Sequence, residues 1–496
     1  MSNSLPFIER ALNFKNHTAL IDKNGDHNYK DLRGSASIVA SNLLHNETDL
    51  QESRVAFMVS PGFVYVAVQW GIWLAGGIAV PLCISHPLPE IEYVLQDSEA
   101  EILIVDPEFQ EKTNSLTRRN NLQVLLPGAL LSGKSRVLPQ IELNRRAIIL
   151  YTSGTTSRPK GAVLTHRNIV SQINTLVEAW GWTSSDHILH VLPLHHTHGI
   201  VNALLCALWS GATCEMLPKF DAKLVWNKFI EGTITLFMAV PTIFVKLLSY
   251  WEEANFEDQV KMSEACSKLR LMVSGSAALP ESVFRKWEEI TGHTLLERYG
   301  MTEIGMALSN PLNGERKPGF VGMPLPGVTL RLVDESSNEI KDEGVPGEIQ
   351  VKGDNIFKEY WRKPEATRQV FRDNWFCTGD IAVVDKGYYK ILGRSSVDII
   401  KTGGYKVSAL EIEEILRTHP RIRECAIVGI EDTEWGEIVS AAIVPYSKHS
   451  FALNDLHEWA KEKMASYKIP RKIRILDELP RNVMGKVNKP ELKKLF

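Results

Sequence analysis

Short apolar runs recur along residues 1–393, and each ends at a turn or a polar loop. They include VAFMVS, EILIVD, AIILYT, HILHVL, ITLFMAV and LRLMVSG. Longer segments with a helix-like spacing of apolar residues separate them. Because strands that alternate with helices form parallel sheets flanked by helices, the pattern predicts an α/β fold with functional loops at the carboxyl ends of the strands.

The pattern changes twice towards the C-terminus. EGVPGEIQVKG and DKGYYKILG place turn signals between short strand-like runs, which predicts a smaller β-rich subdomain. After Gly393, the helix-like ALEIEEILRTHP precedes the strand-like ECAIVGI and EIVSAAIVPY. We therefore expect a large N-terminal domain over residues 1–393 and a small, mobile α+β domain over residues 394–496. Such a layout suits closure over a substrate.

Charge and hydropathy argue against nucleic-acid and membrane partners. With 56 basic and 59 acidic residues, the net charge of -3 gives no case for a nucleic-acid surface. The most apolar stretch, GIWLAGGIAVPLCI at residues 71–84, contains three glycines and a proline. It is shorter than the roughly 20 residues that cross a bilayer, so we expect a buried helix followed by a strand.

Cysteine usage and the N-terminal segment indicate a cellular compartment. The six cysteines form no CxxC pair, which is typical of reduced thiols. The start, MSNSLPFIERALNF, has no basic segment followed by an apolar core. We expect a cytoplasmic protein.

The stretch YTSGTTSRPKGA, at residues 151–162, has the composition of a phosphate-binding loop. An apolar run leads into small residues, whose backbone N–H groups can point at an anion. Hydroxyl and ammonium donors are supplied by Ser153, Thr155, Thr156 and Lys160. The loop is not of the Walker A type, because Pro159 replaces the second glycine and Gly161 the final hydroxyl. An ordinary turn with a solvated lysine has the same composition.

Three further stretches bear on this loop. They are LLERYGMTE (295–303), WFCTGD (375–380) and LPRNVMGK (479–486). In this order and at these separations, the four stretches resemble the adenylate-forming acyl-CoA synthetase superfamily over essentially the whole chain. The resemblance implies an enzyme that joins an acid to coenzyme A. Its small-molecule substrates would be the acid, ATP and CoA, with Mg²⁺ as cofactor.

The reaction in this superfamily explains the residue types. The acid's carboxylate attacks the α-phosphate of ATP, so cations and N–H groups must surround that phosphate. The resemblance implies that the β- and γ-phosphates are held by Thr152, Ser153, Gly154, Thr155, Thr156 and Lys160. Thr302 would contact the α-phosphate and Glu303 would hold Mg²⁺, which commonly takes one or two carboxylates plus substrate phosphates. Ser157 departs from the family, which usually has glycine there.

The resemblance also implies a nucleoside site. Tyr299 would pack against adenine, and the base would be lined by Ser276, Ala277, Gly300 and Met301. Asp380 has acceptor oxygens for the ribose diol, and Arg394 could reach the same sugar.

The small domain carries residues for both steps of the implied reaction. Lys486 would stabilise the phosphate during adenylation, after which the small domain rotates so that CoA can attack the adenylate. Asp398 is the expected hinge, although the segment from Arg394 to Asp398 is one residue longer than the usual form. Gly403 and Gly404 would let the pantetheine arm of CoA pass close to the backbone.

The run HVLPLHHTHG contains four histidines: His190, His195, His196 and His198. No HExxH pattern or carboxylate at ligand spacing accompanies them, which disfavours a zinc site. The resemblance places His196 at the acyl pocket, and we expect the others to be core or supporting groups.

Arg298 precedes the tyrosine of YGMTE, where most family members have a small or apolar residue. A buried guanidinium is costly unless it is paired, so a substrate with a second carboxylate is its natural partner. SGSAALP, ERYGMTE and GGYKVSALEIE also resemble malonyl-CoA synthetases. We expect malonate as the acid and methylmalonate as a second substrate. Lys246 is a candidate second cation, or an exposed lysine of an amphipathic helix.

Three other functions compete with this prediction. A medium- or long-chain fatty acyl-CoA synthetase would use Arg298 in a structural salt bridge. An adenylation enzyme could load a carrier protein, and the absence of a carrier domain after Lys486 counts only against the fused form of such an enzyme. A non-catalytic nucleotide-binding relative is disfavoured, because Lys160, Glu303 and Lys486 are all present.

Overall fold

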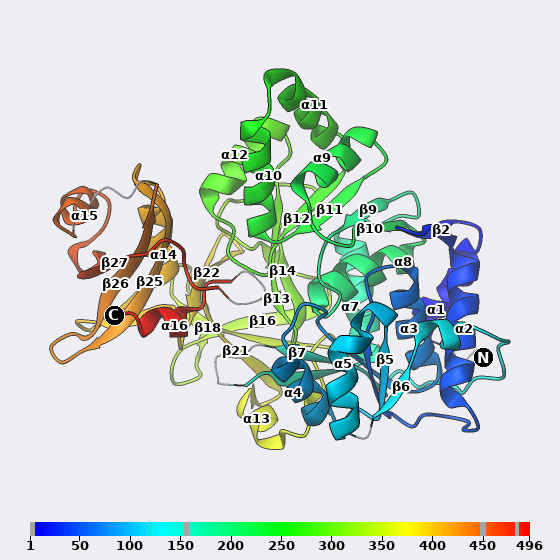
Figure 1. Cartoon of the computed structure of the whole chain (residues 1–496). Coiled ribbons are helices and arrows are strands. Elements are labelled where there is room, and N and C mark those ends of the chain that lie inside the picture. The colour runs from blue at the N-terminus through cyan, green and yellow to red at the C-terminus, as the bar shows by residue number, and fades with distance from the viewer. Residues whose placement is uncertain (1–4, 121, 153–157, 447–452, 482–485) are drawn as a thin grey trace.

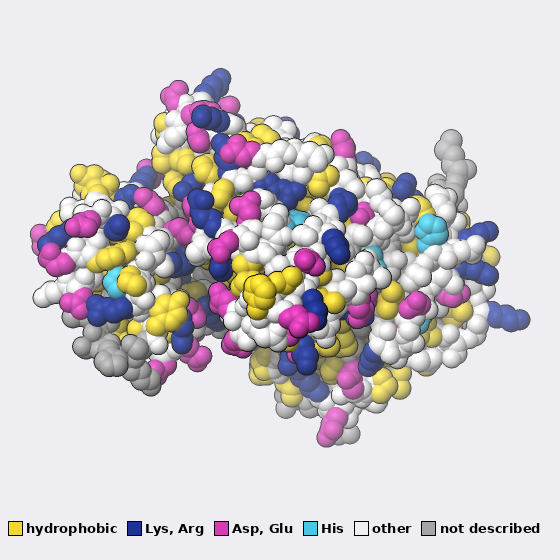
Figure 2. Space-filling view, turned by 90° about the horizontal axis from the view of Figure 1, so that it is seen from above, with side chains coloured by type: hydrophobic (Ala, Val, Ile, Leu, Met, Phe, Trp, Pro, Cys, Tyr) yellow, Lys and Arg dark blue, Asp and Glu magenta, His cyan; other side chains and the backbone are white. Residues whose placement is uncertain are grey.

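The computed structural model describes residues 5–120, 122–152, 158–446, 453–481 and 486–496. It consists of a large body and a smaller C-terminal body, which lies on the left in Figure 1. None of the helices in these ranges combines the length and the apolar character that a bilayer span requires. Basic and acidic side chains are interspersed on the face seen from above (Figure 2).

The first large sheet has nine strands, and the inner strands from β1 to β13 pair in parallel. In spatial order, the strands are β15 (Met323–Pro324), β14 (Gly305–Ser309), β13 (Leu296–Met301), β12 (Leu271–Ser274), β11 (Leu236–Ala239), β9 (His187–His190), β10 (Thr213–Met216), β1 (Thr18–Asp22) and β2 (Gly25–Asn28).

The second large sheet has seven strands, of which β6, β5, β3, β4 and β7 are parallel. In spatial order, its strands are β19 (Glu359–Tyr360), β8 (Lys160–Thr165), β7 (Arg146–Thr152), β4 (Ile78–Pro81), β3 (Arg54–Met58), β5 (Ile102–Val105) and β6 (Gln123–Leu125).

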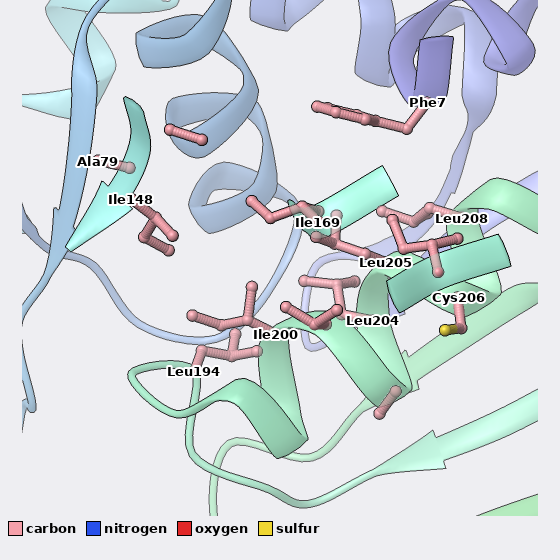
Figure 3. Close-up of a cluster of buried hydrophobic side chains, with 14 of the residues drawn as sticks. Phe7, Ala79, Ile148, Ile169, Leu194, Ile200, Leu204, Leu205, Cys206 and Leu208 are labelled. Carbon is pink, nitrogen blue, oxygen red and sulfur yellow. The ribbon is translucent and has the colours of Figure 1, made fainter. Parts of the chain in front are cut away.

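Successive strand residues point to opposite sides, so both faces of each large sheet carry apolar side chains. Helices cover both of these faces. In β12, Leu271 and Val273 join a core between the two sheets, whereas Met272 packs with the outer helices. In β3, Phe57 joins the central core and Met58 the opposite face. Figure 3 shows part of the central core.

The helices that cover the two large sheets form three groups. The central core is formed with α1 (Pro6–Glu9), η1 (Arg10–Phe14), α2 (Tyr29–Leu44), α3 (Phe63–Leu74), α6 (Pro127–Leu130), α7 (His166–Ala179), the π-helix η2 (His198–Leu205) and α8 (Cys206–Ser210). The nine-stranded sheet is covered outside by α9 (Ala222–Glu231), α10 (Pro241–Glu253), α11 (Phe256–Ser267) and α12 (Glu281–Thr291). The seven-stranded sheet is covered by α4 (Leu88–Ser98) and α5 (Pro107–Asn120).

Two smaller sheets complete the chain. The β-rich subdomain contains β16 (Val328–Val333), β17 (Glu339–Ile340), β18 (Gly347–Gly353), β20 (Phe371–Arg372), β21 (Trp375–Asp385) and β22 (Tyr388–Arg394), with α13 (Pro364–Gln369) beside it. The C-terminal body contains β23 (Ile399–Thr402), β24 (Tyr405–Ser408), α14 (Ala409–Leu416), β25 (Ile422–Asp432), β26 (Gly436–Pro445), α15 (Leu453–Ala460), η3 (Ser466–Lys468), β27 (Lys472–Ile475) and α16 (Lys489–Lys493).

This architecture confirms the predicted fold class. The large domain of helix-covered sheets, the β-rich subdomain and the small α+β domain are all present. The predicted boundary falls at the last residue of β22, Arg394, and the C-terminal sheet begins at Ile399.

Candidate active site

The predicted acyl-pocket arginine lies where β12 ends beside β13. These strands are parallel, with Ser274 paired to Glu297, so Ser276 and Arg298 come next to each other. Arg298 is only 3% exposed, and its Nη2 donates a hydrogen bond to Ser276 Oγ at 3.2 Å. Gly275 permits this packing, because a Cβ there would lie 2.6 Å from Arg298 Cζ.

A hydrogen-bonded chain connects Arg298 to His198 in η2. Ser276 Oγ lies 3.2 Å from His198 Nδ1, and since it accepts from Arg298, its own proton points to the imidazole. Burial lowers the pKa of His198 well below its usual value, and the Arg298 charge lowers it further. The ring is therefore neutral, with its proton on Nε2. Two buried N–H donors, His198 Nε2 and Arg298 Nε, have no hydrogen-bond partner among the described residues.

No described carboxylate forms an ion pair with Arg298. Burial lowers the pKa of Arg298 to about 9, and no neighbouring acid offsets it. Glu297 is adjacent in sequence but points to the other side of β13, because strand residues alternate. Buried arginines are normally paired, so this group is suited to bind an anion.

The loop after β12 holds Ser276 in an uncommon conformation. Its φ is +69°, in the left-handed region that non-glycine residues rarely adopt. Such strain persists only where the surroundings enforce it, and it is frequent at ligand sites. The next predicted residue, Ala277, is exposed on the same loop.

The predicted nucleoside residues Tyr299, Asp380 and Arg394 are brought together. Asp380 and Arg394 are directly paired across β21 and β22, and Arg394 Nε donates to Asp380 Oδ1 at 3.0 Å. Tyr299 Oη donates to the other carboxylate oxygen at 2.6 Å. Burial raises the pKa of Tyr299, and the nearby Asp380 charge raises it further, so the phenol keeps its proton.

The turn between β13 and β14 carries Thr302 and Glu303. Gly300 is paired to Met306, and a Cβ on Gly300 would lie 2.1 Å from the Gly305 carbonyl oxygen, so the turn requires glycine there. Met301 pairs with Gly305 and is half-buried, as is Thr302.

Tyr360 connects Glu303 to the phosphate-loop lysine. Its hydroxyl donates to Glu303 Oε1 at 2.8 Å, and Lys160 Nζ lies 5.1 Å from its ring centroid. Burial raises the pKa of Glu303, while the Tyr360 hydrogen bond and the charges of Arg394 and Lys160 oppose this rise. Tyr360 was missed from sequence, since its two-residue strand has no pattern of its own. Pairing of β19 with β8 brings it here.

The strands β7 and β8 bracket the predicted phosphate loop. Thr152, the last residue of β7, is paired with Lys160, the first residue of β8. Thr152 Oγ1 donates to the Lys160 carbonyl at 3.4 Å. The other predicted contacts, Ser153, Gly154, Thr155 and Thr156, lie outside the described residues.

Lys486 of the small domain reaches the same site. Its side chain keeps contact with solvent. Partial desolvation lowers its pKa, and the positive charges of Arg298 and Arg394 lower it further, whereas Asp380 acts in the opposite sense. The orientation of the small domain therefore brings Lys486 near Arg298, Arg394 and Asp380.

The four histidines of HVLPLHHTHG take different environments. His190 is buried, and its Nε2 lies 3.0 Å from the Gly199 carbonyl, as expected for a core residue. His196 is half-buried, and its Nε2 has no hydrogen-bond partner among the described residues. Burial lowers the pKa of His196 to about 4, and the Lys486 charge lowers it further. His198 belongs to the Arg298 group, which sequence spacing did not reveal.

The expected hinge, Asp398, lies in the connection between the domains. Its Oδ2 accepts from the Arg394 backbone N–H at 3.0 Å, and its Oδ1 lies 2.6 Å from Lys489 Nζ. Lys489 also contacts Glu413 Oε1 at 2.8 Å. Gly393 has φ +130°, and a Cβ there would lie 2.3 Å from Asp398 Cβ.

The predicted CoA glycines form the exposed turn between β23 and β24. Gly403 and Gly404 have φ of +55° and +83°. A Cβ on Gly403 would lie 2.7 Å from the Trp435 ring, and Arg471 Cζ lies 3.6 Å from the centroid of that ring.

Lys246 is not among the residues hydrogen-bonded in the Arg298, Ser276 and His198 group. Its side chain is exposed on α10, and its Nζ is 5.8 Å from the Phe220 ring centroid. The structure therefore agrees with an amphipathic-helix lysine, and a role in malonate binding stays a prediction.

Two family models cover this chain. The AMP-binding enzyme model matches residues 7–361, and the AMP-binding enzyme C-terminal domain model matches residues 411–486. The chain belongs to the AMP-binding enzyme family.

Relatives of this AMP-binding enzyme include malonate–CoA ligases. A mitochondrial malonate–CoA ligase of Mus musculus is 47% identical, with 99% of this chain and 90% of that protein covered. A malonate–CoA ligase of Arabidopsis thaliana is 43% identical, with 90% and 78% covered. The cytoplasmic location expected from the sequence stays a prediction, since the mouse relative is mitochondrial.

Solved structures extend the similarity. ATP-bound MatB from Rhodopseudomonas palustris matches with a TM-score of 0.91 and 33% identity, covering 99% of both chains. A malonyl-CoA ligase product complex with methylmalonyl-CoA and AMP matches with a TM-score of 0.71 and 33% identity, covering 96% of this chain and 100% of that one.

Proposed function

We propose that this AMP-binding enzyme is a malonate–CoA ligase, which converts malonate, ATP and CoA into malonyl-CoA, AMP and diphosphate. The observation that carries this proposal is the buried Arg298 guanidinium, which has no protein anion beside it among the described residues. One carboxylate of malonate reacts with ATP, and the other pairs with Arg298. The relatives named malonate–CoA ligases support this substrate.

The substrate's distal carboxylate would be received by two donors. Arg298 Nε and His198 Nε2 are both buried, and both lack a hydrogen-bond partner among the described residues. Charge-assisted hydrogen bonds to a carboxylate would satisfy them. Ser276 fixes both side chains through its hydroxyl. His196 would line the pocket nearer to Lys486.

In the first step, the reacting carboxylate attacks the α-phosphate and displaces diphosphate. Lys486 and Thr302 would stabilise the charge on the α-phosphate, and Lys160 with the loop beginning at Thr152 would hold the β- and γ-phosphates. Tyr299 would pack against adenine, and Asp380 with Arg394 would hold the ribose. Four further residues would line the base: Ser276, Ala277, Gly300 and Met301.

Glu303 is suited to hold Mg²⁺. It is a buried carboxylate 2.8 Å from the Tyr360 hydroxyl, and Lys160 Nζ lies 5.1 Å from the centroid of the same ring. Hard oxygen ligands of this kind, combined with substrate phosphates, are what Mg²⁺ prefers. When bound, the ion would neutralise charge on the leaving diphosphate.

In the second step, the CoA thiol attacks the malonyl carbonyl and AMP leaves. Rotation of the small domain about Asp398 would replace Lys486 by the turn at Gly403 and Gly404. The absence of side chains on this turn leaves room for the pantetheine arm beside the backbone. The lower TM-score to the CoA-product complex is compatible with such a rotation.

Methylmalonate is a second substrate in this proposal, because it carries the same two carboxylates. A fatty acyl-CoA synthetase is disfavoured, since an alkyl chain would leave Arg298 buried without an anion. An enzyme that loads a carrier protein shares the first step and differs only in the acceptor.

The test measures diphosphate release from the wild-type enzyme with malonate, methylmalonate, propionate and octanoate, with and without CoA. Malonate should react fastest, and one CoA should be consumed per AMP formed. Faster reaction with octanoate would contradict the assignment of the acid. Rapid malonyl transfer to a carrier protein, without consumption of CoA, would contradict the assignment of the acceptor.

A further inference from the structure

A second group of chemically reactive side chains lies next to the acyl pocket and takes no part in the proposed steps. Cys83 follows β4, His86 lies in the loop before α4, and His195 precedes η2. The ligand atoms of these three residues all lie within 4.8 Å of one another. Cys83 is buried and the two histidines are half-buried.

The loop that carries Cys83 and His86 is held in place by hydrogen bonds. Lys112 Nζ donates to the Ile84 carbonyl at 3.0 Å and to the His86 carbonyl at 2.7 Å. Ser85 Oγ lies 3.2 Å from Cys83 Sγ. These contacts fix the loop backbone, so the two side chains are presented together.

His86 is oriented by a carboxylate. Glu90 Oε2 lies 3.2 Å from His86 Nδ1, while His86 Nε2 is buried without a hydrogen-bond partner among the described residues. Histidines that bind metal ions commonly use one ring nitrogen as ligand and donate the other N–H to a carboxylate. Glu90 is therefore placed to accept the Nδ1–H of His86 when Nε2 serves as a ligand.

His195 is the third member of the group, and its ring packs against those of two other histidines. Its centroid lies 5.7 Å from that of His86 and 4.0 Å from that of His196.

We propose that Cys83, His86 and His195 form a binding site for a divalent transition-metal ion such as Zn²⁺, with water as the fourth ligand. One thiolate and two imidazoles suit Zn²⁺ and Co²⁺ and are poor ligands for Mg²⁺, so the site is chemically distinct from Glu303. Zn–S bonds of about 2.3 Å and Zn–N bonds of about 2.0 Å separate tetrahedral ligands by roughly 3.5 Å. The three donors lie within 4.8 Å of one another, so they need to approach by at most about 1.3 Å, which side-chain rotation can supply.

The ion would also affect the neighbouring pocket residue. The His195 ring packs against the His196 ring. Coordination of His195 would therefore restrain the contact between these two rings. The histidines of HVLPLHHTHG alone lack the spacing of a zinc motif. Two of the three ligands come from a loop more than 100 residues earlier, at Cys83 and His86.

The test is a titration of the reduced full-length protein with Co²⁺, in the absence of ATP. Thiolate coordination gives near-ultraviolet charge-transfer absorption, and a four-coordinate site gives intense visible bands. Both should appear at one equivalent of Co²⁺ and disappear when Zn²⁺ is added. Glu90→Gln should retain the bands with an affinity about 10- to 100-fold weaker.

Variants assign the ligands. Cys83→Ser should lose the charge-transfer band, and His86→Ala or His195→Ala should lose the visible bands. Cys377→Ser is the matched control, since that half-buried thiol lies on β21, and it should leave the spectrum unchanged. Glu303→Gln should also leave it unchanged, which separates this site from the magnesium site.

Absence of charge-transfer absorption in the wild type at saturating Co²⁺ would overturn the proposal. So would bands that survive Cys83→Ser or disappear in Cys377→Ser. Melting curves identify variants that fail to fold. If Cys83→Ser does not fold, the His86→Ala variant provides the test, because His86 is only half-buried. A folded His86→Ala variant that keeps the full spectrum and affinity also overturns the proposal.

Discussion

Two arginines lie near opposite ends of strand β12 and differ in what their guanidinium groups contact. Arg270 precedes the strand and forms a two-pronged ion pair with Asp186, with Nε and Nη2 each 2.9 Å from a carboxylate oxygen. Its Nη1 donates to the Trp180 carbonyl at 2.8 Å. Arg298 packs on Gly275, just after the strand, and donates to one hydroxyl.

The difference separates a structural cation from a binding one. Arg270 is the more exposed, with 32% of its side-chain surface accessible, yet it is fully paired. Arg298 is buried, and no described carboxylate offsets its charge. Pairing a buried charge makes it tolerable, and leaving it unpaired costs stability. The unpaired charge of Arg298, at the carboxyl end of the parallel strands, therefore lowers the stability of the folded protein. A bound dicarboxylate can offset this loss.

A large effect on adenylation is expected for Lys486, the lysine whose pKa is lowered by burial and by the charge of Arg298. Lys486→Ala should slow adenylation of malonate about 100- to 1000-fold, the usual loss when a group that stabilises transition-state charge is removed. Thioester formation from supplied malonyl-adenylate should survive, because it uses the other domain orientation. Single-turnover assays of each step check this. Lys461→Ala, on the small-domain surface, is the control. Equal loss in both steps of a folded variant would contradict the role.

Arg270→Ala should lower the stability of the protein without changing its preference for malonate. It leaves the Asp186 carboxylate buried without its cation, which should destabilise the large domain by about 3 kcal/mol, the low end for a broken buried pair. The ratio of malonate to propionate activity should not change in the folded variant. Thermal melting and the two-acid assay measure these outcomes. A selective loss of malonate activity would show that the contrast between the two arginines is wrong.

The smallest effect concerns Glu297, the buried acid next to Arg298 in sequence. Burial raises its pKa to about 8, and the charges of Glu414 and Glu281 raise it further. Between the pKa of Glu297 in the unfolded chain and about pH 8, the folded protein holds a proton that the unfolded chain has lost. The free energy of unfolding therefore falls as the pH rises. The slope is about 1 kcal/mol per pH unit. Glu297→Gln should remove this slope between pH 6 and 8 in denaturation experiments. An unchanged slope would mean that Glu297 is already ionised in the folded protein at these pH values.

Sequence patterns predicted the fold and the local motifs well. Strand and helix periodicity gave the layered architecture, and the YGMTE and TGD stretches placed Tyr299 and Asp380, which share a hydrogen bond. The unusual Arg298 was identified because a cation replaces an apolar residue there. These predictions depend on residues that are close in sequence or belong to one motif.

Contacts between distant segments could not be predicted in the same way. His198 meets Ser276 only because η2 packs near the end of β12, and Tyr360 meets Glu303 through a two-residue strand. The Lys246 position was ambiguous, since helical spacing does not say which face is exposed. The Cys83 cluster also joins separate loops. Tertiary packing, which local patterns do not encode, decides each of these cases.

The most direct test of the account compares malonate and propionate in wild-type enzyme and Arg298→Ala. Truncation would leave the distal carboxylate buried without its partner, a loss of about 2 to 5 kcal/mol in transition-state stabilisation. Malonate should therefore lose roughly 30-fold to several thousand-fold in kcat/KM, at about 1.4 kcal/mol per tenfold change. Propionate activity should hold or rise, and the melting temperature should not fall, because no carboxylate of the protein loses a partner. A folded variant in which both activities fall in parallel would contradict the pairing of Arg298 with malonate.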